Sequence, residues 1–216
     1  MREIEPVTGP VQASESGCVP DRIAVRKANR QTLRFLRSTT SRTIAEVGIY
    51  KGYTSREIAK YLGGEGELHL FDFENRVAAV IAELNAEGYQ NIFGHGNSGK
   101  LLDSYNWSLM RLLQEHSSPI FDYVFLDGAH TWAVDALAFL LSDRLLKVGG
   151  YIDFDDYEWS LERSPSQNPS AFPLTAQLYT EEQIGEKQVA LIVDLLVKRD
   201  PRYVEVVTNK IFRKIA

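Results

Sequence analysis

Two apolar stretches that each end in carboxylates constrain the fold of this chain most strongly. The first covers residues 121–126 and is followed by Asp127 and His130, and the second covers residues 151–154 and is followed by the acidic pair 155–156. Short apolar runs of this kind are typical of strands buried within a sheet. Ligands of open α/β sheets bind beyond the carboxyl ends of the strands, so we expect these polar side chains to converge on one site.

A turn with two glycines follows another predicted buried strand, residues 43–47. The turn, residues 48–55, reads Gly-Ile-Tyr-Lys-Gly-Tyr-Thr-Ser and precedes a predicted helix. Gly48 and Gly52 let the backbone approach a ligand, and the free N–H groups at the start of the helix favour an anionic group. Glu46 lies inside the strand, where a buried carboxylate needs a partner. Together these features indicate a site for a nucleotide-like ligand.

An acidic residue ends the next predicted strand, residues 68–72. In nucleotide-binding α/β folds an acidic residue at the end of the strand that follows the glycine turn binds the ribose hydroxyls, and Asp72 fits that role. Two alternatives stay open: Asp72 caps the helix predicted over residues 75–86, or Glu74 takes either role in its place.

Ser98 lies in a polar turn after a third predicted strand. It is expected either to contact the edge of an adenine ring or to cap a helix predicted over residues 99–115.

The C-terminal part of the chain predicts an antiparallel hairpin. Helices are predicted over residues 131–146 and 181–198, and strands over residues 203–207 and 210–215. Only two residues separate the strands, so they must pair as a hairpin. The alternation of strands and helices predicts a single α/β domain over residues 1–216.

Two segments lack a regular pattern. Residues 1–20 are rich in Pro, Gly and Ser and predict an irregular arm. Residues 158–180 hold polar residues, aromatic residues and three prolines. A loop of that length directly after the carboxylates is expected to be a substrate lid.

The composition argues against several classes of function. A net charge of -5 and a pI near 5.5 give no general basic footprint for nucleic acid, and the basic residues within 22–30 fit the solvated face of a helix. No apolar run approaches the ~18 residues of a membrane span, and the N-terminus lacks the apolar core of a signal peptide. Cys18 is the only cysteine and is interpreted as an incidental thiol. We therefore expect a cytoplasmic protein without a nucleic-acid or membrane partner, and leave its oligomeric state open.

These motifs in this order resemble the class I S-adenosylmethionine-dependent methyltransferases. The resemblance rests on the segment 46–55, Asp72, Asp127 with His130 three residues on, and the pair 155–156. Within the class, the chain is similar to the metal-dependent O-methyltransferases, such as catechol O-methyltransferase. It looks closer still to the bacterial branch that methylates sugar or aromatic hydroxyls of natural products. The resemblance, which begins near residue 42, implies a Rossmann-like, seven-stranded, mostly parallel sheet with helices on both faces and a C-terminal antiparallel hairpin.

The resemblance also implies roles for the candidate residues. Mg²⁺ or another divalent cation would be bound by Asp127, Asp155 and Asp156. The catechol enzymes carry an amide at the position of Asp156 and a lysine base at that of His130, so this chain departs from them at both. The residues implied in binding S-adenosylmethionine are Glu46, Gly48, Tyr50, Gly52, Thr54, Asp72, Ser98 and Asp127.

We therefore expect a metal-dependent O-methyltransferase that acts on a small hydroxylated molecule. A hydroxyl bound to Mg²⁺ becomes more acidic, and His130 has the chemistry of a general base, unless it only supports the start of its helix. Two alternatives remain: a metal-independent N- or O-methyltransferase in which His130 acts alone, and a non-catalytic protein that binds S-adenosylmethionine.

Overall fold

A seven-stranded sheet forms the centre of the computed structural model, which describes residues 28–216. The predictions for residues 1–20, for Cys18 and for the basic residues before Ala28 lie outside this range. The strands are β1 (Thr43–Val47), β2 (Glu67–Phe73), β3 (Ile92–Asn97), β4 (Phe121–Leu126), β5 (Leu146–Phe154), β6 (Tyr203–Val207) and β7 (Ile211–Lys214).

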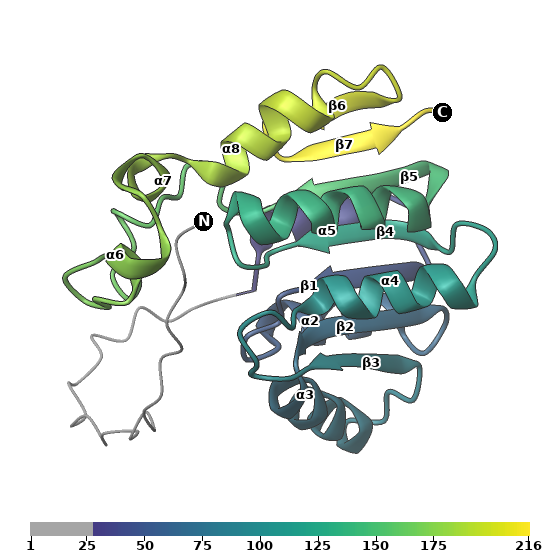
Figure 1. The fold of residues 1–216 in the computed structure, drawn as a ribbon. Coiled ribbons are helices and arrows are strands. Elements are labelled where there is room, and N and C mark those ends of the chain that lie inside the picture. The colour runs from purple at the N-terminus through teal and green to yellow at the C-terminus, as the bar shows by residue number, and fades with distance from the viewer. Residues whose placement is uncertain (1–27) are drawn as a thin grey trace.

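The strand order is β3-β2-β1-β4-β5-β7-β6 (Figure 1). The first five strands in this order are parallel, whereas β7 runs antiparallel to both β5 and β6. The mostly parallel sheet and the C-terminal hairpin predicted from the sequence are confirmed. The parallel strands all point toward the side of the molecule where the segment after β5 lies (Figure 1).

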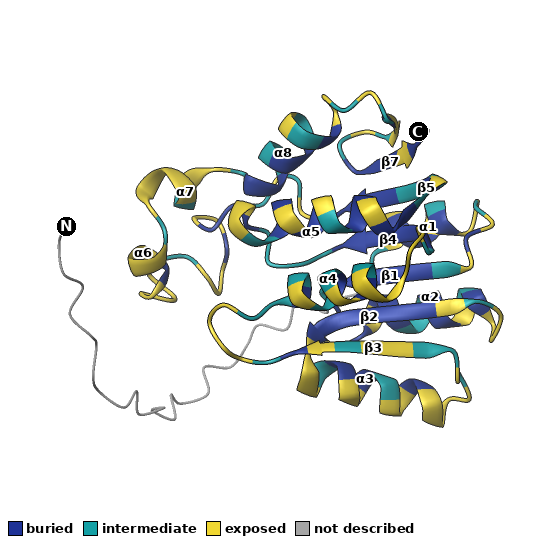
Figure 2. Cartoon of the chain, turned by 45° about the vertical axis from the view of Figure 1, so that its right-hand side comes forward, coloured by how far each residue is buried: buried dark blue, intermediate teal, exposed yellow. Residues whose placement is uncertain are grey.

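Helices cover both faces of this sheet. They are α1 (Arg30–Leu36), α2 (Tyr53–Leu62), α3 (Glu74–Ala86), α4 (Tyr105–Glu115), α5 (Trp132–Leu145), α6 (Thr175–Leu178), α7 (Glu181–Gly185), α8 (Gln188–Ile192) and the π-helical turn η1 (Val193–Val197). Helices α4, α5 and α8 pack side by side on one face, and α1, α2 and α3 pack on the other (Figures 1 and 2). None of the described helices is long and apolar enough to cross a membrane.

The continuous apolar pattern of β4 reflects burial on both sides. Tyr123 and Phe125 belong to the core under α1, α2 and α3, while Val124 and Leu126 belong to the core under α4, α5 and α8. Successive side chains of a strand point to opposite faces, so a strand covered by helices on both sides buries its apolar side chains on both. Asp122, near the start of β4, stays partly exposed.

Two predicted helices were too long. The helix expected over residues 99–115 begins only at Tyr105, because Asp103 accepts hydrogen bonds from the N–H and hydroxyl of Ser98 and closes a loop ahead of it. Side-chain bonds of this kind compete with helix formation. The helix expected over residues 181–198 breaks after Gly185, where the backbone of Glu186 is extended.

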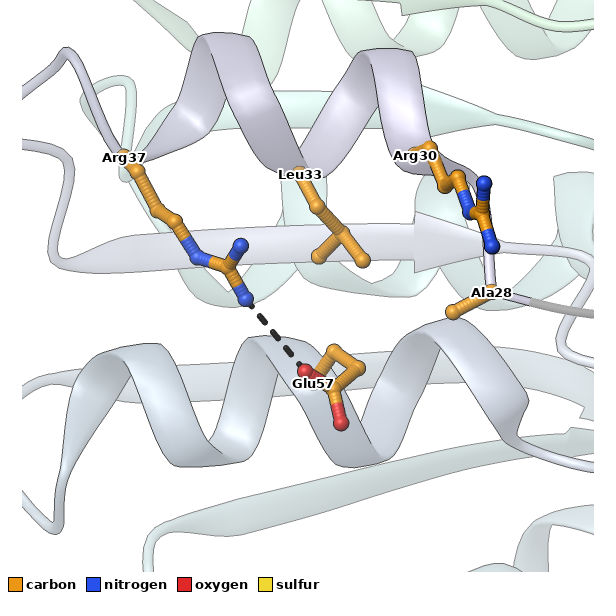
Figure 3. Close-up of a pocket in the computed structure, with 5 residues that line it drawn as sticks. All are labelled: Ala28, Arg30, Leu33, Arg37 and Glu57. Carbon is orange, nitrogen blue, oxygen red and sulfur yellow. Dashed lines mark hydrogen bonds and ion pairs between the residues drawn. The ribbon is translucent and has the colours of Figure 1, made fainter.

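A shallow cavity of about 420 Å³ lies between α1 and α2 (Figure 3). Leu33 is buried beside it, and Arg37 forms an ion pair of 3.3 Å with Glu57 across it. This cavity marks where α1 packs on α2 and contains none of the predicted site residues.

Candidate functional site

Asp127, His130 and Asp156 meet beyond the carboxyl ends of β4 and β5. Each offers one ligand atom, and these atoms all lie within 4.8 Å of one another. His130 Nε2 is 3.4 Å from Asp156 Oδ2 and 3.7 Å from Asp127 Oδ1. The convergence follows from the fold, because β4 and β5 are adjacent parallel strands that end at the same edge of the sheet.

His130 and Asp156 both sit in left-handed backbone conformations, with φ of 57° and 58°. Such conformations cost free energy for residues other than glycine and persist only where neighbouring groups hold them. Asp135 holds the first one: its Oδ2 accepts from His130 N at 2.7 Å, and its Oδ1 accepts from Ala129 N at 3.2 Å. The Tyr105 hydroxyl donates to the same carboxylate. Asp135 therefore fixes the loop that presents His130.

The carboxylates of this cluster repel one another. Although 33% of the Asp127 side chain is exposed, burial of its carboxyl group raises its pKa well above the usual range, and the nearby charges of Asp155 and Asp156 raise it further. Lys210 opposes this shift. Two or more carboxylates at such proximity favour a bound cation.

Asp155 lies next to the cluster but is engaged elsewhere. Its Oδ1 is 3.3 Å from Lys210 Nζ, and Lys210 is also 2.9 Å from Asp153 Oδ1. From the sequence we expected Asp127, Asp155 and Asp156 to act together, whereas the structure groups Asp127 and Asp156 with His130. No motif pointed to Lys210, because only the pairing of β7 with β5 brings it to this edge of the sheet.

The glycine turn after β1 touches the end of β4 directly. Gly48 has a φ of 87°, and a Cβ added to it would lie 1.8 Å from the Asp127 carbonyl oxygen. Gly52 has a φ of 70°, and its Cβ would lie 2.7 Å from the side chain of Val80. Both positions therefore require glycine, and the turn lies beside the carboxylate cluster.

Glu46 has a partner inside the protein. The Ser55 hydroxyl donates to Glu46 Oε2 at 2.5 Å, and burial raises the pKa of Glu46 to about 8. Thr54 is also occupied, because its Oγ1 accepts from the backbone N–H of Asn29 at 3.1 Å. The first turn of α2 thus anchors both the strand before it and the chain ahead of α1.

Asp72 organises the glycine turn. Its Oδ2 accepts from the backbone N–H groups of Ile49 and Tyr50 at 2.9 and 3.0 Å, and Arg76 pairs with the same carboxylate. Phe73 occupies the N-cap of α3, so the alternative in which Asp72 caps that helix is wrong.

Ser98 does not cap α4, whose N-cap is Ser104. Its N–H and hydroxyl both donate to Asp103, as described above. Of its two predicted roles, the adenine contact is the one that stays a prediction.

An aromatic ring borders the cluster on the side of the predicted lid. The Trp159 ring lies 5.2 Å from the His130 ring at 52°. Trp159 and Asp135 border the cluster and were not predicted from the sequence. Trp159 lies three residues after Asp156, and Asp135 lies five residues after His130. These short spacings are the signals that could have identified them.

A second cavity, of about 630 Å³, lies between the starts of α2 and α3 beside the glycine turn. Tyr50 and Arg76 line it together with Tyr53, and its wall includes neither the carboxylates of the cluster nor His130.

Comparisons with known proteins identify the family and the fold. A family model described as a methyltransferase domain matches residues 45–157, and a comparison with curated proteins found no match. An O-methyltransferase from Bacillus cereus, in complex with S-adenosylhomocysteine, is 17% identical with a TM-score of 0.52, over 89% of this chain and 84% of its own.

Two further solved structures are similar at the same level. The S-adenosylhomocysteine-bound methyltransferase of Podospora anserina is 17% identical with a TM-score of 0.57, over 86% of this chain and 77% of its own. An O-methyltransferase of tomaymycin synthesis from Streptomyces achromogenes, in complex with S-adenosylmethionine, is 19% identical with a TM-score of 0.52. The match covers 86% of this chain and 79% of its own. At these identities the structural likeness establishes the fold.

Proposed function

This chain belongs to the methyltransferase domain family, and we propose that it transfers the methyl group of S-adenosylmethionine to a hydroxyl of a small molecule with the help of a divalent cation. The observation that carries the proposal is the direct contact between the Gly48 turn and the end of β4. Through that contact the glycine turn lies beside a cluster of two carboxylates and a histidine.

The glycine turn is the proposed methyl-donor half of the site. We propose that S-adenosylmethionine lies along Glu46, the turn residues Gly48, Tyr50 and Gly52, and the start of α2 at Thr54. Asp72 and Ser98 would contact its ribose and adenine, and Asp127 would border it. The geometry that supports this is a strand, a turn with two left-handed glycines and a helix N-terminus in succession. The Bacillus cereus and Streptomyces achromogenes proteins, which share the fold, bind S-adenosylhomocysteine and S-adenosylmethionine.

The carboxylate cluster is the proposed acceptor half, and its donor set fits a divalent cation. Mg²⁺ is usually held by one or two carboxylates, with water and substrate oxygens completing its shell. Asp127 and Asp156 would hold it, with Asp155 adjacent. When bound, the cation would make a coordinated hydroxyl more acidic.

His130 is the proposed general base. Its ring faces the carboxylates, and the Asp135 contacts to the backbone fix its position. In the transfer, the acceptor oxygen forms a bond to the methyl carbon, the carbon–sulfur bond breaks, and S-adenosylhomocysteine leaves with the electron pair. The hydroxyl proton goes to His130. The contact of the two halves at Gly48 and Asp127 would align acceptor and donor for in-line displacement.

Transfer of a labelled methyl group tests this function. Purified protein would be incubated with labelled S-adenosylmethionine and a panel of catechols and hydroxylated sugars, with and without a chelator. We expect transfer to a hydroxylated acceptor that the chelator abolishes and added Mg²⁺ restores. Transfer that is indifferent to the chelator would contradict the role of the metal.

One observation favours a metal-independent O-methyltransferase as the second candidate. Lys210 already places a positive charge beside Asp155, so part of the negative charge is compensated by the protein itself. In that case the chelator would leave transfer unchanged, while substitution of His130 would still abolish it.

A further inference from the structure

Lys210 lies buried between two carboxylates at the end of β5. Its side chain comes from the residue before β7 and is only 10% exposed. Its Nζ is 2.9 Å from Asp153 Oδ1 and 3.3 Å from Asp155 Oδ1, and it donates to the Phe154 carbonyl oxygen at 3.1 Å. The ammonium also lies 5.3 Å from the centre of the Phe125 ring.

Asp153 anchors this lysine from inside the protein. Asp153 is fully buried, and its Oδ2 accepts from the Tyr123 hydroxyl at 2.6 Å. Its other oxygen faces Lys210, so the two form a buried ion pair that does not depend on any ligand. A buried carboxylate is stable only with such a partner.

Asp155 contacts the same Lys210 ammonium. Asp153 lies in β5 and Asp155 directly follows its last residue, and both carboxylates face Lys210. The acidic groups at this edge of the sheet therefore fall into two sets. Asp153 and Asp155 share Lys210, whereas Asp127 and Asp156 share the space in front of His130.

We propose that Lys210 is a resident counter-cation of the acceptor site, a positioning residue that holds Asp155 and weakens the binding of a divalent cation at Asp127 and Asp156. This inference rests on the proposed function and assigns a regulator to its metal site. A fixed ammonium acts in two ways. It repels an incoming divalent cation across the partly buried site, and it pairs with an oxygen of Asp155 that would otherwise attract the cation. It also keeps the crowded carboxylates compatible with one another when no cation is bound.

Binding of Mn²⁺ in the absence of substrate tests the inference. Lys210→Met alone would leave the buried Asp153 without a cationic partner, so the informative variant is the double substitution Lys210→Met with Asp153→Asn. Titration calorimetry of the whole chain would compare this variant with the wild type and with Lys210→Arg, which keeps the charge. Far-ultraviolet circular dichroism and denaturant unfolding would verify that each variant is folded.

We expect the double variant to bind Mn²⁺ about tenfold more tightly than the wild type, and Lys210→Arg to stay within about threefold of it. Asp153→Asn alone is expected to bind no more tightly than the wild type, because Lys210 then faces Asp155 alone.

The outcomes separate this inference from the metal dependence itself. If the wild type binds Mn²⁺ and the double variant binds it no more tightly, the role of Lys210 is overturned and the proposed function stands. If only the double variant binds Mn²⁺, the role of Lys210 stands and the proposed metal dependence of the wild type is overturned. If neither binds, both ideas are wrong.

Discussion

Gly48 lies against the backbone of Asp127 so closely that a Cβ on Gly48 would be 1.8 Å from the Asp127 carbonyl oxygen. The same two segments are joined by a hydrogen bond from Asp127 N to the Val47 carbonyl oxygen at 2.8 Å. The proposed donor turn and the proposed acceptor strand therefore share one rigid backbone contact. Any side chain at residue 48 has to move one of the two halves.

Gly48→Ala is expected to destabilise the protein severely. The added methyl group meets backbone, which cannot rotate away, and the residue must also keep a φ of 87°. Gly64→Ala is the matched control, because Gly64 has the same φ but nothing lies within 4 Å of its Cβ. Denaturant unfolding should show a loss of about 1 kcal/mol for Gly64→Ala and a loss several times larger for Gly48→Ala. Equal losses would mean that strain at φ, and not the contact with Asp127, requires the glycine.

Asp135→Asn is expected to slow methyl transfer, although Asp135 is not one of the residues proposed to bind the substrates. The amide offers one acceptor oxygen in place of the two that receive the N–H groups of Ala129 and His130, so the loop that presents His130 loosens. We expect kcat to fall about tenfold, with little change in the KM for S-adenosylmethionine, together with a loss of about 2 kcal/mol in the free energy of unfolding.

Tyr105→Phe is the comparison for this substitution. It removes the hydroxyl that donates to Asp135 and accepts from Ala129 N at 2.9 Å, but leaves the bond from His130 N to Asp135 in place. Its effect on kcat should therefore be smaller than that of Asp135→Asn, and an equal or larger effect would show that Asp135 does not act through His130.

Glu46 is expected to make the stability of the protein depend on pH. Burial raises its pKa in the folded protein from 4.5 to about 8, against the opposing bond from Ser55. Between these values the folded state holds a proton that the unfolded state has lost, so stability decreases as pH rises. The contribution is complete below pH 4.5 and is lost as pH rises through about 8. A shift of this size corresponds to a few kcal/mol.

Glu46→Gln removes this titration and keeps the shape of the side chain. The free energy of unfolding, measured from about pH 5 to about pH 9, should fall with pH more steeply in the wild type than in the variant. Glu65→Gln, at an exposed position after α2, should run parallel to the wild type. If the free energy of unfolding of Glu46→Gln fell with pH as steeply as that of the wild type, a group other than Glu46 would be responsible for the pH dependence.

The sheet was predictable because its signals are local. The apolar runs of β1, β4 and β5 and the two-residue spacing of the hairpin each fix an element from its own residues, and the edge shared by parallel strands then brings Asp127 near Asp156. The environment of Asp155 was not predictable, because Lys210 is separated from it by 55 residues and reaches it only through the pairing of β5 with β7.

The start of α4 illustrates the other kind of limit. The apolar spacing after residue 99 is compatible with a helix, but the bonds between Asp103 and Ser98 close a loop and delay the helix to Tyr105. Side-chain bonds to nearby backbone decide such boundaries, and residue spacing does not encode them. The same bonds removed one of the two roles predicted for Ser98.

Substitution of His130 distinguishes a general base from a metal ligand. His130→Asn is the suitable variant, because asparagine tolerates the left-handed backbone at φ of 57° better than most residues. We expect turnover to fall by about 10² to 10⁴, since the acceptor proton then lacks a base, while the affinity for S-adenosylmethionine stays unchanged. Rates would be measured with the labelled cofactor across pH, and His116→Gln, at an exposed histidine after α4, is the control.

The affinity for Mn²⁺ decides between the two roles. His130 Nε2 lies 3.4 Å from Asp156 and 3.7 Å from Asp127, so the same nitrogen could face a cation or a substrate hydroxyl, but it cannot bind a metal and accept a proton at once. As a base, His130 contributes little to ion binding, and the variant should bind Mn²⁺ within about threefold of the wild type. A loss of Mn²⁺ affinity as large as the loss of turnover would make His130 a ligand, and the proton would then have to leave to water or to a carboxylate.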